Sequence, residues 1–186
     1  MNIEILTLPE IRDVYHHRLI YDFPPDERKP LSMIEASLKN RQYVCYGMKN
    51  PSGILAYAFF VVIHHQYLLD YFAVRTDSRG TGIGGRFLQE LCGNCLKDAS
   101  CILAEVVDPC SQSNPEEKIT CERRIRFYLN SGLQNTGVRV NTFGVSYLLL
   151  EAPNASRHSI EDVRQIYAMI YRSILPDDVF PLKVHI

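Results

Sequence analysis

The feature that most constrains the fold is a segment in which an apolar strand runs through a glycine-rich turn into an amphipathic helix. The segment spans residues 68–91, LLDYFAVRTDSRGTGIGGRFLQEL, and its glycines are Gly80, Gly82, Gly84 and Gly85. A glycine inside a helix costs about 1 kcal/mol relative to alanine, so a cluster at one helix end requires a physical reason. A strand that leads directly into a helix is typical of a sheet that carries helices on its faces.

The lack of side chains at this helix start suits the turn for binding an anion. The first N–H groups of a helix have no intrahelical acceptor, and the helix dipole adds partial positive charge at the same end. Arg79 adds a full positive charge immediately before the glycines. The pattern therefore predicts a pyrophosphate-binding turn, since tight packing would explain one glycine but not four.

Three phosphate-binding patterns compete for this segment. The P-loop requires a lysine after its last glycine, and none follows here. The dinucleotide fingerprint G-x-G-x-x-G begins at Gly80-x-Gly82, but it needs an acidic residue at a strand end about 20 residues further on. Glu105 lies inside its predicted strand instead, so this pattern matches weakly. The third pattern, Arg/Gln-x-x-Gly-x-Gly/Ala, is met by Arg79, Gly82 and Gly84.

The third pattern, within residues 74–88 (VRTDSRGTGIGGRFL), resembles the acetyl-CoA-binding motif of the GNAT superfamily of N-acetyltransferases. Residues 126–133 (RFYLNSGL) are similar to the helix of that family that ends in Tyr-x-x-x-Gly-Phe, and residues 103–107 (LAEVV) to its Leu-Glu-Val strand. The resemblance extends over about residues 67–147. It implies an α/β (α+β) fold: a central mixed, mostly antiparallel twisted sheet of about seven strands with helices on both faces.

Hydrophobic periodicity and helix breakers agree with such a fold. The predicted strands are residues 2–6, 43–48, 54–63, 67–74, 101–107, 133–141 and 144–151, and the predicted helices are residues 9–21, 31–39, 82–97, 117–130 and 159–175. Ser159 and Asp162 form a capping-box pattern at the start of the last helix. We expect a single domain over residues 1–186, with a core of about 1–152 and a C-terminal helix and tail over 156–186.

Composition excludes several classes of function. Of the 186 residues 46% are hydrophobic and 22% charged, with a formal net charge of −1, so neither disorder nor non-specific nucleic-acid or membrane binding is expected. The N-terminus shows no signal peptide, and the six cysteines are irregularly spaced, which favours buried thiols and a cytoplasmic location. Cys92-x-x-Cys95 lies within a predicted helix without a second ligand pair, so no metal is expected.

The resemblance assigns the cofactor contacts. Acetyl-CoA would be the cosubstrate, entering where two neighbouring parallel strands, residues 67–74 and 101–107, splay apart at a bulge. The pantetheine arm would pair with the backbone of the first strand, as an added strand does, at Phe72, Ala73 and Val74. The pyrophosphate would be held by the turn residues Arg79, Gly80, Thr81, Gly82, Ile83, Gly84 and Gly85.

Three residues are candidates for catalysis. Tyr128 matches the family tyrosine that donates a proton to the leaving thiolate, although a helix position beside Ile125 also suits it for packing. A carboxylate inside an apolar strand is costly unless it is paired or protonated, and burial raises its pKa into a range useful for a general base. This argument applies to Glu105, in ILAEVV, and to Asp70, in LLDYF, and water is a third candidate for removing the proton.

The function implied is the transfer of the acetyl group of acetyl-CoA to a primary amine by direct attack in a ternary complex. A catalytically silent acyl-CoA sensor or regulatory module and a dinucleotide-binding domain are the alternatives. The sequence does not identify the acceptor among protein N-termini, lysines, polyamines, aminoglycosides and small metabolites. It leaves room for a homodimer.

Overall fold

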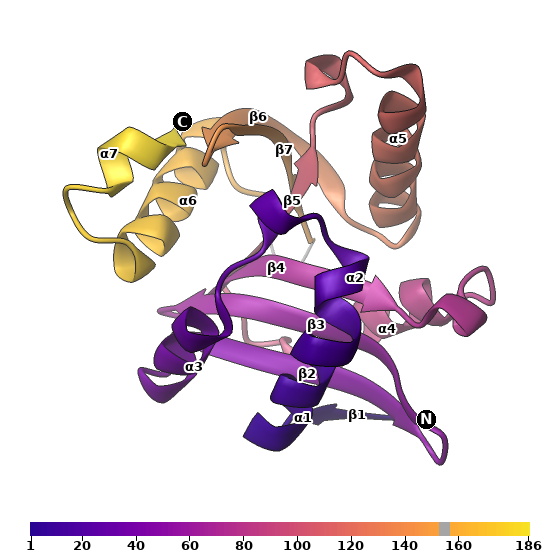
Figure 1. Ribbon diagram of the computed structural model, residues 1–186. Coiled ribbons are helices and arrows are strands. Elements are labelled where there is room, and N and C mark those ends of the chain that lie inside the picture. The colour runs from indigo at the N-terminus through magenta and orange to yellow at the C-terminus, as the bar shows by residue number, and fades with distance from the viewer. Residues whose placement is uncertain (153–156) are drawn as a thin grey trace.

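The computed structural model describes residues 1–152 and 157–186 of the chain (Figure 1). Its strands form one eight-stranded sheet in the order β1-β2-β3-β4-β5-β7-β6-β8. They are β1 (Asn2–Ile5), β2 (Tyr43–Asn50), β3 (Gly53–Ile63), β4 (Gln66–Val74), β5 (Cys101–Val107), β6 (Gln134–Thr142), β7 (Val145–Glu151) and β8 (Val184–His185). Only β4 and β5 pair in parallel, so the mixed, mostly antiparallel sheet predicted from the sequence is confirmed.

The helices follow the predicted order. They are α1 (Leu8–Val14), which continues through a π-helical turn into α2 (Ile20–Asp22), then α3 (Leu31–Lys39), α4 (Ile83–Glu90), α5 (Pro115–Asn130), α6 (Ile160–Ile174) and α7 (Phe180–Lys183). Ser159 caps α6 together with Asp162, as the sequence predicts. Residue 156, the predicted start of the C-terminal region, lies outside the described residues.

Three details differ from the prediction. The helix predicted over residues 82–97 is α-helical only over Ile83–Glu90 and continues as a π-helical turn over Leu91–Cys95. The chain end adds the short strand β8, which pairs with β6 and brings the described strands to eight rather than about seven. Helix α5 begins at Pro115, two residues earlier than predicted, because Asn114 accepts a hydrogen bond from the Glu116 amide at 2.9 Å and caps the helix. Proline is favoured at a first helical position, where its missing N–H costs nothing.

Helices cover both faces of the sheet and define two cores. On one face, α1, α3 and α6 pack against the sheet through residues such as Ile11, Ile34 and Tyr167. On the opposite face, α4 and α5 pack through residues such as Phe87 and Phe127. Figure 1 shows α1 to α3 on one side of β2 to β4 and α4 on the other. We call these the α6 face and the α4 face.

A β-bulge at Asp70 bends β4. In the ladder with β3, Leu69 pairs with Phe60 and Tyr71 pairs with Phe59, so Asp70 has no partner in that ladder. A bulge places an extra residue in one strand and turns the strand away from its neighbour. Asp70 and Tyr71 consequently both point to the α6 face, where each contacts Lys29.

The bend separates the parallel pair. Strands β4 and β5 pair from Gln66 to Leu69 and from Cys101 to Ala104, and the described ladder ends there. The remaining parts of the two strands, residues 70–74 and 105–107, diverge. A strand pair that opens in the middle of a sheet leaves main-chain donors and acceptors without a strand partner, and these can bind an extended ligand.

None of the helices in the described part of the chain has the length and apolar character needed to cross a membrane.

Candidate functional site

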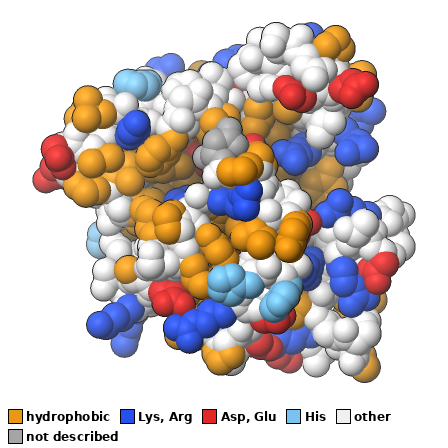
Figure 2. Space-filling view, in the orientation of Figure 1, with side chains coloured by type: hydrophobic (Ala, Val, Ile, Leu, Met, Phe, Trp, Pro, Cys, Tyr) orange, Lys and Arg blue, Asp and Glu red, His pale blue; other side chains and the backbone are white. Residues whose placement is uncertain are grey.

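The gap between β4 and β5 opens into a large cavity. Its volume is about 990 Å³, and it is lined from three sides: by Phe72 to Val74, by the turn around Gly80 to Gly85, and by Glu105 to Val107. Helix α5 contributes Tyr128 to the same cavity. Figure 2 shows a hollow in the surface of the molecule. Hydrophobic side chains lie inside the hollow, and Lys and Arg side chains lie at one side of it. Ligand pockets commonly have volumes of about 300–1,000 Å³, so this cavity can hold an extended ligand.

The glycine turn presents its main chain to this cavity. Gly80 and Gly82 have φ values of +77° and +82°, and a Cβ added at either would meet no atom within 4 Å. The positive φ angles therefore explain these two glycines, and the space beside them is open. The first recorded helical hydrogen bond here runs from the Arg86 amide to the Gly82 carbonyl at 3.1 Å. Among the described residues, no acceptor is recorded for the amides of residues 80–85, so they are available to an anion.

Gly84 has a different role from its neighbours. A Cβ at this position would lie 3.1 Å from Val74 Cγ2 and 3.2 Å from Phe127 Cε2. Gly84 thus allows α4 to approach both β4 and α5. Packing accounts for this one glycine of the cluster, whereas Gly85 makes only an ordinary contact at 3.5 Å with Ser131 Oγ.

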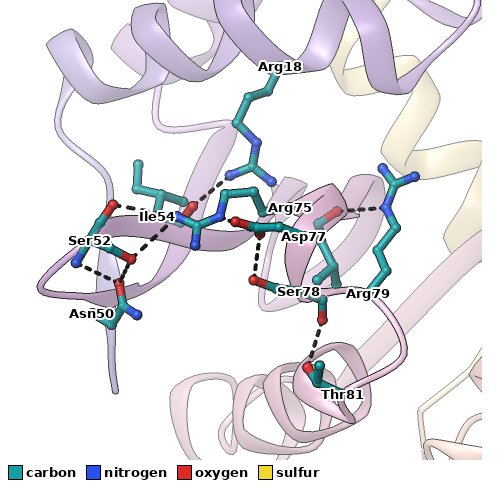
Figure 3. A network of polar contacts seen from close by, with 10 residues as sticks. Arg18, Asn50, Ser52, Ile54, Arg75, Asp77, Ser78, Arg79 and Thr81 are labelled. Carbon is teal, nitrogen blue, oxygen red and sulfur yellow. Dashed lines mark hydrogen bonds and ion pairs between the residues drawn. The ribbon is translucent and has the colours of Figure 1, made fainter.

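Hydrogen bonds fix the turn between β4 and α4 (Figure 3). The Thr81 hydroxyl donates to the Ser78 carbonyl at 2.7 Å, and Arg79 Nε donates to the Val74 carbonyl at 2.9 Å. Arg79 Nη2 lies 2.8 Å from Asp22 Oδ1 of α2. Arg79, which the sequence predicts to bind the pyrophosphate, therefore also pairs with Asp22. The Arg79 side chain is still 53% exposed.

Glu105 lies on the far wall of the cavity, on the α6 face. Its Oε1 atom accepts hydrogen bonds from the hydroxyl groups of Tyr167 and Tyr171, the second at 2.8 Å. Burial raises the pKa of Glu105, against the opposing effects of these hydroxyl groups and of the Lys29 charge. No partner is recorded for its Oε2 atom among the described residues. That oxygen can accept a proton without breaking an existing contact.

Asp70 lies on the near wall, and both of its oxygens are engaged. Oδ1 forms an ion pair with Lys29 Nζ, and Oδ2 accepts a hydrogen bond from the Tyr43 hydroxyl. The Asp70 side chain is 6% exposed, so its charge is neutralised inside the protein. This arrangement favours a structural role for Asp70, because both of its carboxylate oxygens already have partners within the protein.

Tyr128 comes from the α4 side of the cavity. Its ring packs against Phe72 and Phe127, with ring centroids 6.2 and 5.2 Å apart. Burial raises its pKa to about 12, so the phenol keeps its proton at neutral pH. No hydrogen bond of its hydroxyl is recorded among the described residues. The packed ring and the unused hydroxyl show that the packing role and the functional role suggested by the sequence are compatible.

No family model matches the chain. The curated Bacillus subtilis protein named "Putative acetyltransferase YjbC" is 26% identical over 167 residues, which cover 84% of this chain and 81% of that protein. A GNAT-family structure from Bacteroides thetaiotaomicron aligns with a TM-score of 0.70 at 18% identity, covering 92% of this chain and 96% of that one. The ribosomal-protein-S18-alanine N-acetyltransferase of Escherichia coli aligns with a TM-score of 0.61 at 17% identity, covering 84% and 96%.

The chain has the fold of the GNAT acetyltransferases. The name of the curated relative agrees with the acyltransferase class predicted from the sequence. An aminoglycoside 6'-N-acetyltransferase solved in complex with coenzyme A has the same fold, with a TM-score of 0.60 at 16% identity over 86% of this chain and all of that one. The roles of individual residues here stay predictions.

The structure brings all of the predicted site residues except Thr81 and Ile83 to the lining of one cavity. Strand β4, the glycine turn, Glu105 and Tyr128 all line it, as does Asp70. Sequence reasoning missed the partners of the two carboxylates. Lys29 and Tyr43 engage Asp70, and the two α6 tyrosines engage Glu105. The spacing of Tyr167 and Tyr171 on one helix face was the available signal, but it does not reveal which strand that face covers.

The loop after β5 does not reach the cavity. Residues 108–117 are absent from its described lining. Asp108 instead accepts a hydrogen bond from the Cys110 amide at 3.0 Å and pairs with Arg139 at 2.7 Å. These contacts fold the loop against the sheet edge.

Proposed function

We propose that this chain transfers the acetyl group of acetyl-CoA to a primary amine by direct attack in a ternary complex. The observation that carries the proposal is the single cavity shared by the open β4–β5 gap, the bare amides of the glycine turn, Glu105 and Tyr128. One end offers donors for an anion, and the other offers a buried carboxylate for a cation. An acyl-CoA and an amine require this pair of environments.

The amides of residues 80–85 would hold the pyrophosphate, assisted by Arg79. The β4 backbone at Phe72, Ala73 and Val74 would pair with the pantetheine arm, because its edge toward β5 has no strand partner after Leu69. This placement would direct the thioester toward the interior of the gap. A coenzyme A complex of a structure with this fold supports the choice of cosubstrate.

An amine must lose a proton before it can attack. We assign this proton to Glu105 Oε2, directly or through one water molecule, because Oε1 is already held by two tyrosines. The raised pKa of Glu105 makes it a better base than an exposed carboxylate. Asp70, engaged by Lys29 and Tyr43, is the second choice.

The neutral nitrogen then attacks the thioester carbonyl carbon and forms the amide bond, while the C–S bond breaks and its electron pair stays on sulfur. The Tyr128 hydroxyl would supply the proton that converts this thiolate to the thiol of coenzyme A. Its pKa of about 12 keeps the phenol protonated at neutral pH, so the proton is present when the C–S bond breaks and the thiolate forms. The proton removed by Glu105 restores the phenol through solvent.

Steady-state release of free thiol from acetyl-CoA tests the proposal. The amine panel follows the names of structurally similar proteins: an alanine-terminated peptide, an aminoglycoside and spermidine, with a lysine peptide added. Enzymatic transfer is supported if the wild-type chain acetylates any of these amines and the Glu105→Gln variant acetylates the same amine more slowly. Tight binding of acetyl-CoA without turnover on any amine supports the sensor alternative. A chain that binds NAD but does not bind coenzyme A would contradict the proposal.

A further inference from the structure

A second cluster of reactive side chains lies away from the cavity, at the closed end of the parallel strand pair. Cys101 begins β5, Glu151 ends β7, and His158 directly precedes the cap of α6. The Sγ, carboxylate and imidazole atoms of these residues all lie within 4.8 Å of one another. None of the three lines the cavity described above.

The sheet register explains why Cys101 and Glu151 meet. Glu151 pairs with Leu103 across the β5–β7 ladder, so Cys101 is its diagonal neighbour on the same face. Cys101 Sγ lies 3.6 Å from Glu151 Oε1. Cys101 is 1% exposed and the Glu151 side chain is 5% exposed, so both are enclosed by the protein.

His158 completes the cluster from the other side. Its Nδ1 atom pairs with Glu151 Oε1, and its main-chain amide lies 3.4 Å from Glu151 Oε2. The imidazole is 24% exposed. The cluster is therefore buried on the strand side and reachable from solvent on the histidine side.

Gln66 supplies a buried polar atom on the same face of the sheet as Cys101. Its side-chain Oε1 is buried and has no hydrogen-bond partner among the described residues. Gln66 is the direct β4 partner of Cys101 in the parallel ladder, so both side chains point to the same face. A buried carbonyl oxygen without a donor destabilises the fold, and a cation or its bound water would satisfy it.

We propose that Cys101, Glu151 and His158 bind a divalent transition-metal ion, with zinc as the best match. A thiolate, an imidazole and a carboxylate are the ligand types that zinc takes in proteins, and the thiolate disfavours magnesium and calcium. Water or Gln66 Oε1 fills the fourth position. Binding releases the thiol proton of Cys101.

This site ties the start of α6 to β5 and β7. Because α6 carries Tyr167 and Tyr171, the metal holds the helix that positions Glu105. No local motif marks the site, because its ligands are separated by 50 and 7 residues along the chain. The Cys92-x-x-Cys95 pair, the one motif considered for zinc, contributes no ligand.

Metal content and cobalt spectroscopy test the proposal. Purified chain is stripped with a chelator and titrated with Co²⁺, then Zn²⁺ displacement is followed. We expect one equivalent per chain and a thiolate-to-cobalt charge-transfer band. Both should be lost in Cys101→Ser and in His158→Gln, and retained in the matched control Cys95→Ser, whose thiol is exposed.

Alkylation of the wild-type chain covers the case in which a variant fails to fold. Zinc should protect Cys101 from a thiol reagent during partial unfolding, as read by mass spectrometry of the peptide. Absence of Co²⁺ and Zn²⁺ binding by the wild-type chain would overturn the proposal. Full binding by Cys101→Ser, or loss in Cys95→Ser alone, would place the metal elsewhere and also overturn it.

Discussion

The hydroxyl of Tyr171, on α6, lies 2.8 Å from Glu105 Oε1, on β5. The two residues are 66 positions apart in the chain, and the contact joins the C-terminal helix to a central strand of the sheet. It holds a buried carboxylate in a fixed direction at the cavity wall. The C-terminal helix thereby becomes part of the candidate site.

Glu105→Gln should lower kcat by about 10²–10⁴-fold, the usual contribution of a general base. Gln keeps the shape and can still accept from the tyrosines, but it cannot take a proton. In the wild-type chain, activity should rise with pH through the raised pKa of Glu105, because the base must be ionised. The variant should lose this rising limb. An unchanged pH–rate profile in the variant would remove Glu105 from the mechanism.

The same substitution should stabilise the fold at neutral pH. Burial raises the pKa of Glu105 in the folded chain above its unfolded value, so the folded state binds more protons between the two values. Stability therefore falls as pH rises through that window, and the loss persists above it. Gln does not titrate, so the excess of the variant Tm over the wild-type Tm should grow from about pH 4.5 upward. A variant Tm that stays below wild type at every pH would contradict this assignment.

Tyr171→Phe should shift the pH–rate profile rather than abolish activity. The Tyr171 hydroxyl lowers the pKa of Glu105, so its removal moves the rising limb to higher pH. At high pH, kcat should return to within a few-fold of wild type. Tyr21→Phe, at a side chain that is 79% exposed, is the control and should leave the profile unchanged. A uniform loss at all pH values would mean that Tyr171 supports the fold and not the charge of Glu105.

Tyr128→Phe should keep the affinity for acetyl-CoA and lower kcat by about 10²-fold or more, because only proton donation is lost. The ring packing against Phe72 and Phe127 is preserved. Calorimetry with coenzyme A and thiol release from acetyl-CoA separate binding from transfer. Equal loss of both would assign Tyr128 to binding.

Gly84→Ala should destabilise the chain by about 1–3 kcal/mol, the usual cost of overpacking. The new methyl group would press on Val74 and Phe127 at 3.1 and 3.2 Å. Gly93→Ala is the matched control, because its Cβ meets nothing within 4 Å and its φ is not positive. The control should be neutral or slightly stabilising in urea unfolding. Similar effects at the two positions would contradict the packing role of Gly84.

Much of the fold could be predicted from local sequence patterns. The capping box of Ser159 and Asp162 and the strand at residues 101–107 lie where the sequence predicts them, because each depends on neighbours in the chain. Strand β8 was missed because two residues, Val184 and His185, carry no periodicity. Their strand character depends on pairing with β6, which only the folded chain provides.

The candidate site was only partly predictable for a similar reason. The glycine turn can be recognised in the sequence, because positive φ angles and a helix start without side chains both favour glycine. The bulge at Asp70 leaves none, because any residue can occupy it and its position depends on the β3 register. The partners Lys29 and Tyr43 come from elements whose placement depends on long-range packing.

We propose that acetyl-CoA enters the β4–β5 gap with its pyrophosphate on the main-chain amides after Arg79. Backbone amide NMR during titration with coenzyme A can locate this binding site residue by residue. We expect saturable shifts concentrated in residues 80–85, accompanied by shifts at Phe72, Ala73 and Val74. Saturation that leaves the amides of Gly80 and Gly82 unmoved, or that moves a different surface, would contradict it.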